Sequence, residues 1–147
     1  MAESIHVSRY LVVMLLFIAF VLNWIWEVAQ ISAFKTAEKS MFESLLFCTV
    51  ASVIDALTIW AIYLAAAFLF GRGGWKFYLT AALLAALSVI IFEKTAFAFG
   101  WWSYDERMPV VPVIGVGVLP FLQLIILAPL AIRLALYWQK RGMGSNH

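Results

Sequence analysis

Residues 11–30 read LVVMLLFIAFVLNWIWEVAQ, and this apolar run decides how the chain can fold. A 20-residue helix is about 30 Å long, which matches the hydrocarbon core of a bilayer. The second half of the run contains an amide, a carboxyl and another amide, at Asn23, Glu27 and Gln30. Their i, i+4, i+7 spacing predicts a polar stripe along one helical face. A carboxyl inside a membrane needs partners, so the stripe also predicts a functional site.

The composition of the whole chain predicts three further spans. Of the 147 residues, 65% are hydrophobic and 12% are charged, whereas soluble domains are about half apolar and about one quarter charged. We therefore predict an all-α, polytopic membrane protein, a single integral-membrane domain over 1–147 that folds as a four-transmembrane-helix bundle. The expected spans are 11–33, 45–70, 77–96 and 113–138, separated by charged or glycine-rich connectors. Four spans return the N- and C-termini to the same side.

Charge, cysteine and histidine content argue against several classes of function. The net charge is +2 and the basic residues are scattered, so we expect no binding to nucleic acid. Cys48 is the only cysteine, which excludes an intrachain disulfide and any CxxC motif. His6 and His147 are both terminal, so no histidine is available within the membrane to hold haem or a metal ion. We therefore predict neither a metal nor a cofactor.

The distribution of lysine and arginine predicts the orientation of the bundle. The side of the termini holds Arg9, Arg72, Lys76, Arg133, Lys140 and Arg141, and the other side holds Lys35, Lys39, Lys94 and Arg107. Basic residues favour the cytoplasmic side, so we expect both termini in the cytoplasm. In this orientation each span places one polar residue in the external half of the membrane: Glu27, Asp55, Glu93 and Gln123.

Three acids are the candidate catalytic residues: Glu27, Asp55 and Glu93. Two carboxyls that differ in proton affinity are what proton transfer to and from a carbon or oxygen centre needs. Glu27 or Glu93 is the expected general acid or base, with Asp55 as its electrostatic partner. Asp55 itself is expected to be protonated or paired with Lys94. The alternative interpretation is that Glu27 and Glu93 lie at the membrane interface and are simply solvated.

The candidate ligand-binding residues are Asn23, Trp26, Gln30, Trp102, Tyr104 and Gln123. The amides can bind a polar group of a ligand, or they can join helices by hydrogen bonds worth about 0.6–2 kcal/mol each. The aromatic side chains are expected to wall a pocket for a flat, lipophilic molecule. An ordinary interfacial aromatic belt is the alternative.

Two prolines are expected to distort the fourth span. Pro120 and Pro129 have no N–H to donate to the carbonyls of Val116 and Ile125. With the glycines just before them, they predict a kink or break on the external side of this helix. The freed carbonyls would face the acids.

Three motifs follow one another in the second half of the chain: Phe92-Glu93, then Gly100-Trp101-Trp102-Ser103-Tyr104, then Pro120-Phe121-Leu122-Gln123. This order resembles that of the small membrane carotenoid enzymes, the lycopene-cyclase half-proteins and the carotenoid hydratases. The resemblance implies chemistry on a carotenoid- or isoprenoid-like molecule. Those families have glutamates after the proline, whereas this chain has the amide Gln123, which cannot act as a general acid. The stretch from Asn23 to Gln30 also resembles small bacterial membrane proteins, which implies a bacterial or archaeal cytoplasmic membrane but no activity.

Two hypotheses about function follow from these observations. The first is an enzyme or binding protein that holds a membrane lipid or another lipophilic molecule, isoprenoid- or carotenoid-like, in the external leaflet. The second is a non-catalytic accessory or assembly subunit of a larger membrane complex, whose polar groups bind partner subunits or a second copy of this chain. Transport of a proton or solute ranks below both, because the cytoplasmic half of the spans contains few polar residues.

Overall fold

The computed structural model of this chain describes residues 8–35 and 39–144. Four long helices follow one another: α1 (Arg9–Gln30), α2 (Met41–Phe70), α3 (Trp75–Ala98) and α4 (Val118–Gly144). One 3-10 turn, η1 (Ile31–Ala33), extends α1. Each of the four helices is long and apolar enough to cross a membrane. The predicted all-helical, four-span architecture is therefore confirmed.

Local sequence signals set both ends of α2. At its start, Ser40 and Glu43 form a capping box, in which each side chain accepts a hydrogen bond from the backbone N–H of the other. This cap explains why α2 begins before residue 45, where its span was predicted to start. The helix ends at Gly71, which has a φ of 70°, and Gly73 and Gly74 also have positive φ. Glycine adopts such angles without strain, so residues 71–74 form the tight turn into α3.

α4 begins later than its predicted span, which started at residue 113. Val113 has a φ of 71°, and Val111 N donates to Val116 O at 2.8 Å, so residues 110–117 form a loop. Pro120 consequently lies in the first turn of α4, where backbone N–H groups have no helical partner. The predicted interruption of the fourth span therefore lies before Pro120, and the carbonyl of Val116 is occupied by the loop. α4 continues through Pro129.

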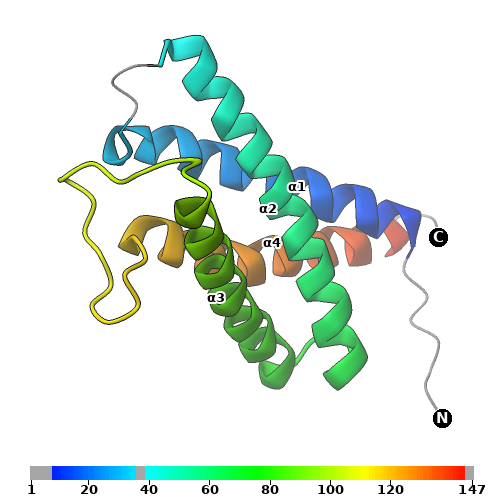
Figure 1. Cartoon of the computed structure of the whole chain (residues 1–147). Helices are drawn as coiled ribbons and strands as arrows, with labels where there is room; N and C mark the ends of the chain where they lie inside the picture. The colour runs from blue at the N-terminus through cyan, green and yellow to red at the C-terminus, as the bar shows by residue number, and fades with distance from the viewer. Residues whose placement is uncertain (1–7, 36–38, 145–147) are drawn as a thin grey trace.

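The four helices form a bundle that is closed at one end and open at the other. Gln139 Nε2 donates to Ser8 Oγ at 3.0 Å, which brings the start of α1 and the end of α4 together. The 71–74 turn lies at this same end, because Arg72 and Gly73 share a surface hollow with Ser8 and Gln139. From that turn, α2 and α3 diverge (Figure 1). α1 packs against α2 and α4, and α3 packs against α4.

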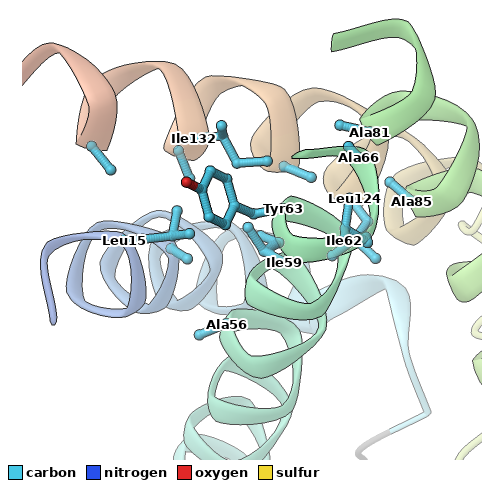
Figure 2. Close-up of a cluster of buried hydrophobic side chains, with 14 of the residues drawn as sticks. Leu15, Ala56, Ile59, Ile62, Tyr63, Ala66, Ala81, Ala85, Leu124 and Ile132 are labelled. Carbon is cyan, nitrogen blue, oxygen red and sulfur yellow. The ribbon is translucent and has the colours of Figure 1, made fainter. Parts of the chain in front are cut away.

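A hydrophobic core fills the closed end of the bundle and includes side chains from all four helices. Figure 2 shows Tyr63 extending from α2 between Leu15 of α1 and Ile132 of α4. Its ring meets the ring of Phe77 edge-on, with the ring centroids 6.1 Å apart. Alanines complete the core: Ala56, Ala66, Ala67, Ala81, Ala85, Ala128, Ala131 and Ala135 are all buried. Small side chains permit close helix packing in membranes, where tight contacts replace the hydrophobic effect between helices.

We predict that Ala66→Leu destabilises the bundle by about 1–3 kcal/mol, because a packed core has no space for three more carbon atoms. Ala66 has 0% of its surface exposed, whereas the neighbouring Ala65 is exposed on the outside of α2. Ala65→Leu is therefore the matched control and is expected to be neutral. Thermal unfolding of the purified variants in detergent, followed by circular dichroism, measures the difference. Equal melting temperatures for the two variants would contradict this account of the core.

Candidate functional site

The polar residues of three helices meet around the side-chain amide of Gln123, near the start of α4. Gln123 Nε2 donates to three acceptors, each at 3.0 Å: Asn23 Oδ1 and Glu27 Oε1 on α1, and Asp55 Oδ2 on α2. Its Oε1 accepts a hydrogen bond from Gln30 Nε2 at 2.9 Å. Asn23, Gln30 and Gln123 are buried. One amide group thus joins α1, α2 and α4.

The amide nitrogen of Gln123 has too few hydrogens to donate one to each of the acceptors around it. An amide nitrogen has two hydrogens, and Gln123 Nε2 has three acceptors. A proton on Glu27 or Asp55 would supply the missing donor. Asn23 Nδ2 donates to Ala19 O at 2.8 Å and forms no hydrogen bond with either carboxyl among the described residues. Two carboxyls that share one amide and need one proton are suited to acid–base chemistry.

Glu93, on α3, is held by the loop that follows its helix. Tyr104 OH donates to Glu93 Oε2, and Trp102 Nε1 donates to the same oxygen at 3.4 Å. Tyr104 OH also accepts a hydrogen bond from Gly117 N at 2.7 Å. A β-carbon at position 117 would lie 2.9 Å from the Tyr104 ring, so only glycine permits this approach. Glu93 is therefore a buried, fixed acceptor rather than a solvated interfacial acid.

The loop keeps Tyr104 in place by packing against the chain that follows α1. Lys35 N donates to Ser103 O at 2.9 Å, and Phe34 forms a β-bridge with Tyr104. The rings of Phe34 and Phe97 contact Tyr104 edge-on, with centroid distances of 5.6 and 4.6 Å. Burial, together with the hydrogen bond to Glu93, raises the pKa of the Tyr104 phenol above the ordinary value of about 10. The phenol therefore remains a hydrogen-bond donor at neutral pH.

A cleft of about 330 Å³ lies between α2 and α3, and residues of α1 and α4 also line it. Its polar lining includes the carboxyls of Glu27, Asp55 and Glu93 and the amides of Gln30 and Gln123. The apolar walls include Phe47 and Ala51 on α2, Val89 and Phe92 on α3, and Leu124 on α4. Ligand sites are typically clefts of about 300–1,000 Å³ with apolar walls and a few convergent polar groups. The cleft matches that description at the small end of the range.

The predicted site residues divide into those that line the cleft and those that lie behind it. The lining residues are Glu27, Gln30, Asp55, Glu93, Trp102 and Gln123. Asn23, Trp26 and Tyr104 lie outside the lining and hold the residues that belong to it. Trp26, for example, donates from Nε1 to Gln30 Oε1 at 3.2 Å.

Asp55 has a different partner from the lysine proposed for it. Asp55 Oδ2 accepts from Gln123, whereas Lys94 is exposed on the outer face of α3. Lys94 Nζ lies beside Gly115, 3.1 Å from where a β-carbon on that glycine would be. Among the described residues, no group of three or more His, Cys, Asp or Glu side chains is placed to hold a metal ion.

Sequence reasoning missed the apolar wall on α2 and the basic residues at the end of the cleft. Phe47, Ala51 and Asp55 all line the cleft, and their i, i+4, i+8 spacing was a usable signal of one helical face. Lys35 and Lys39 also line it. No local pattern marks these two lysines, because their place at the cleft depends on contacts between residues far apart in the sequence, such as the hydrogen bond from Lys35 N to Ser103 O.

We predict that Gln123→Leu destabilises the protein by at least about 1–3 kcal/mol, because it removes the donor to one buried acceptor, Asn23, and to two half-buried ones, Glu27 and Asp55. Gln139→Leu on the same helix is the control, since it removes only the single bond to Ser8 and should lose about 0.5–1.5 kcal/mol. Thermal unfolding in detergent compares the two variants. A loss for Gln123→Leu no greater than for Gln139→Leu would show that the shared amide does not hold the helices together.

We also predict that Tyr104 ionises at a pH above the ordinary tyrosine value of about 10. Because the folded chain holds this proton more tightly than the unfolded chain, the associated stabilisation is complete below about pH 10 and is lost as the pH rises further. The ultraviolet absorbance of tyrosinate, titrated in the native protein and in Tyr104→Phe, isolates this phenol by difference. A difference curve centred at or below about pH 10 would contradict the prediction.

Comparison with known proteins adds no family to these observations. The chain matches no protein-family model, no curated protein and no solved structure. The resemblance to membrane carotenoid enzymes therefore stays a prediction, and the geometry of the cleft is the basis for inferring a function.

Proposed function

We propose that this protein binds a lipophilic, isoprenoid-like molecule in the cleft between α2 and α3 and catalyses proton transfer on it. The observation that carries the proposal is the convergence of Glu27 and Asp55 on one amide at the surface of a largely apolar cleft. A bundle that needed only packing would have no reason to direct two carboxyls toward such a cleft, because burying them costs free energy.

The proposed reaction needs no second substrate. The carboxyl that carries the proton, on Glu27 or Asp55, donates it to one carbon of a carbon–carbon double bond and leaves a positive charge on the other. A carboxylate of the same pair then removes a proton from a neighbouring carbon, so that a double bond forms at a new position. The product is an isomer of the substrate and the carboxyl pair regains its proton. General acid–base catalysis of this kind contributes about 10²–10⁴-fold to a rate.

The α3 side of the cleft supplies groups that would stabilise the positive charge. Glu93 accepts two hydrogen bonds through one oxygen, which keeps its carboxyl group oriented. The rings of Phe92 and Trp102 are stacked, with centroids 6.2 Å apart, and both residues line the cleft. Aromatic faces attract cations by about 0.5–2 kcal/mol. Under this proposal Glu27 and Asp55 move the proton, whereas Glu93 and Trp102 act on the developing charge.

The proposal includes a location and an orientation. We place the protein in a bacterial or archaeal cytoplasmic membrane, as the resemblance of residues 23–30 to small bacterial membrane proteins implies. The distribution of lysine and arginine favours both termini in the cytoplasm. The open end of the bundle then lies in the external leaflet. A lipophilic molecule would reach the cleft sideways from the bilayer, and no soluble carrier is needed.

We predict that Asp55→Asn and Glu27→Gln each abolish formation of the product while the protein still accumulates in the membrane. Both changes keep the shape of the side chain but remove the exchangeable carboxyl proton. The variants are expressed in cells whose own copy is deleted, and their lipid extracts are compared by chromatography and mass spectrometry. The expected result is the loss of one lipid and the accumulation of a second lipid of the same mass. In deuterated water, the product made by the native protein should gain deuterium.

Glu106→Gln is the matched control, because Glu106 is exposed and lies outside the cleft. It should leave the lipid profile unchanged. If all three variants give the native profile at native expression, the catalytic proposal fails. Recovery of a defined partner subunit in mild detergent under that outcome would support the accessory-subunit hypothesis.

A further inference from the structure

The cleft has two kinds of border, and they differ in charge. Near the start of α2 its lining includes Lys35 and Lys39. Along the side, its lining includes Phe47 of α2 and Ile91 of α3, which are 50% and 58% exposed on the outside of the bundle. Figure 1 shows that these two helices separate toward this end. A basic end and an open apolar side are the surroundings that an anionic headgroup and a hydrocarbon chain require.

Neither lysine forms an ion pair with another residue that the structure describes. Among the described residues the only ion pair joins Asp105 to Arg107, at 2.8 Å. Of the described acids near the lysines, Asp105 is therefore engaged, and Glu43 accepts hydrogen bonds from the N-cap of α2. Lys39 Nζ lies 3.7 Å from the centre of the Phe47 ring, which keeps this ammonium group at the border of the cleft.

On the basis of the proposed function, we infer that the ligand is an amphiphile, an isoprenoid chain that ends in a phosphate. The phosphate lies between Lys35 and Lys39, and the chain enters the cleft past Ala51 and Phe92. Phosphate oxygens accept hydrogen bonds from ammonium groups and are attracted by their charge. The inference narrows the ligand from any lipophilic molecule to one class with a charged end.

The charges inside the cleft fix the direction in which such a molecule binds. Glu93 and the Glu27–Asp55 pair, which shares one proton in the proposed reaction, line the interior. The remaining carboxylates repel an anionic headgroup, whereas the lysines attract it. The hydrocarbon part consequently lies beside the carboxyl pair, where a double bond can be protonated. Headgroup binding thus positions the chain for the proposed reaction.

The size of the cleft indicates that only part of a long chain lies inside it. A volume of about 330 Å³ is at the lower limit of ordinary ligand sites. The remainder of the chain leaves between Phe47 and Ile91, where the surface is apolar and faces the bilayer. The enzyme therefore acts on the headgroup-proximal part of the chain and tolerates different lengths beyond it.

The test measures binding of radiolabelled geranylgeranyl phosphate and geranylgeraniol, which share one chain and differ in the phosphate. The full-length protein is studied in phosphatidylcholine nanodiscs, native and as Lys35→Gln/Lys39→Gln. We expect the native protein to bind the phosphate about ten- to thirtyfold more tightly than the alcohol, because each lysine near an anionic lipid adds about a factor of five. The double variant should lose this preference and bind the alcohol as the native protein does.

Three controls separate charge, position and fold. Lys76→Gln removes a lysine that lies near an aromatic ring, Trp75, as Lys39 lies over Phe47, but outside the cleft. It should change neither affinity. Lys35→Arg/Lys39→Arg keeps the charge and should retain most of the preference for phosphate. Ala51→Trp fills the cleft and should weaken both probes equally.

Each outcome decides between the inference and the proposed function. The headgroup inference is overturned if the native protein binds geranylgeranyl phosphate no more tightly than geranylgeraniol, and the double glutamine variant does the same. The cleft then remains a site for neutral isoprenoids. If neither probe binds the folded native protein, both proposals fail for this class. If millimolar inorganic phosphate displaces geranylgeranyl phosphate as well as unlabelled geranylgeranyl phosphate does, the lysines form a free-anion site and the amphiphile is excluded.

Discussion

The structure of the polar site depends on one side chain, the amide of Gln123. It bonds to Asn23 and Glu27 on α1 and to Asp55 on α2, and thus fixes α4 against both helices where the apolar core has ended. In a membrane an unpaired amide or carboxyl has no water to bond to, so these groups are stable only together. The amide nitrogen of Gln123 has two hydrogens but three hydrogen-bond acceptors. A proton on Glu27 or Asp55 would supply the missing hydrogen.

The two ends of the bundle serve different purposes. At the closed end, the contacts among the four helices are mainly apolar and include buried alanines and the ring of Tyr63. From this end α2 and α3 diverge (Figure 1). Residues of both helices line the cleft. Rigid elements that support a site keep its groups in position, which is what proton transfer requires. Glu93 has its own support, because Trp102 and Tyr104 fold back from the loop onto its carboxyl.

Much of the fold and part of the site were predictable from local patterns. The lengths of the apolar segments predicted the four spans. The spacing of Asn23, Glu27 and Gln30 predicted a polar face on α1, and all three residues form hydrogen bonds with Gln123 of α4. The start of α4 was not predictable from hydropathy, because residues 110–117 are apolar yet adopt a loop that a positive φ at Val113 and a hydrogen bond from Val111 to Val116 define. Hydropathy measures preference for the bilayer and carries no information on backbone angles.

The sequence by itself determined that the chain forms four membrane helices and that each places a polar residue toward one end, because both depend only on composition and helical periodicity. Only the tertiary structure decided which of these residues meet. It gave Asp55 the partner Gln123 instead of Lys94, placed Trp26 and Tyr104 behind the cleft, and brought Lys35 and Lys39 to its border. The reason is that a hydrogen bond between helices depends on their rotation and tilt, which contacts among residues far apart in sequence determine.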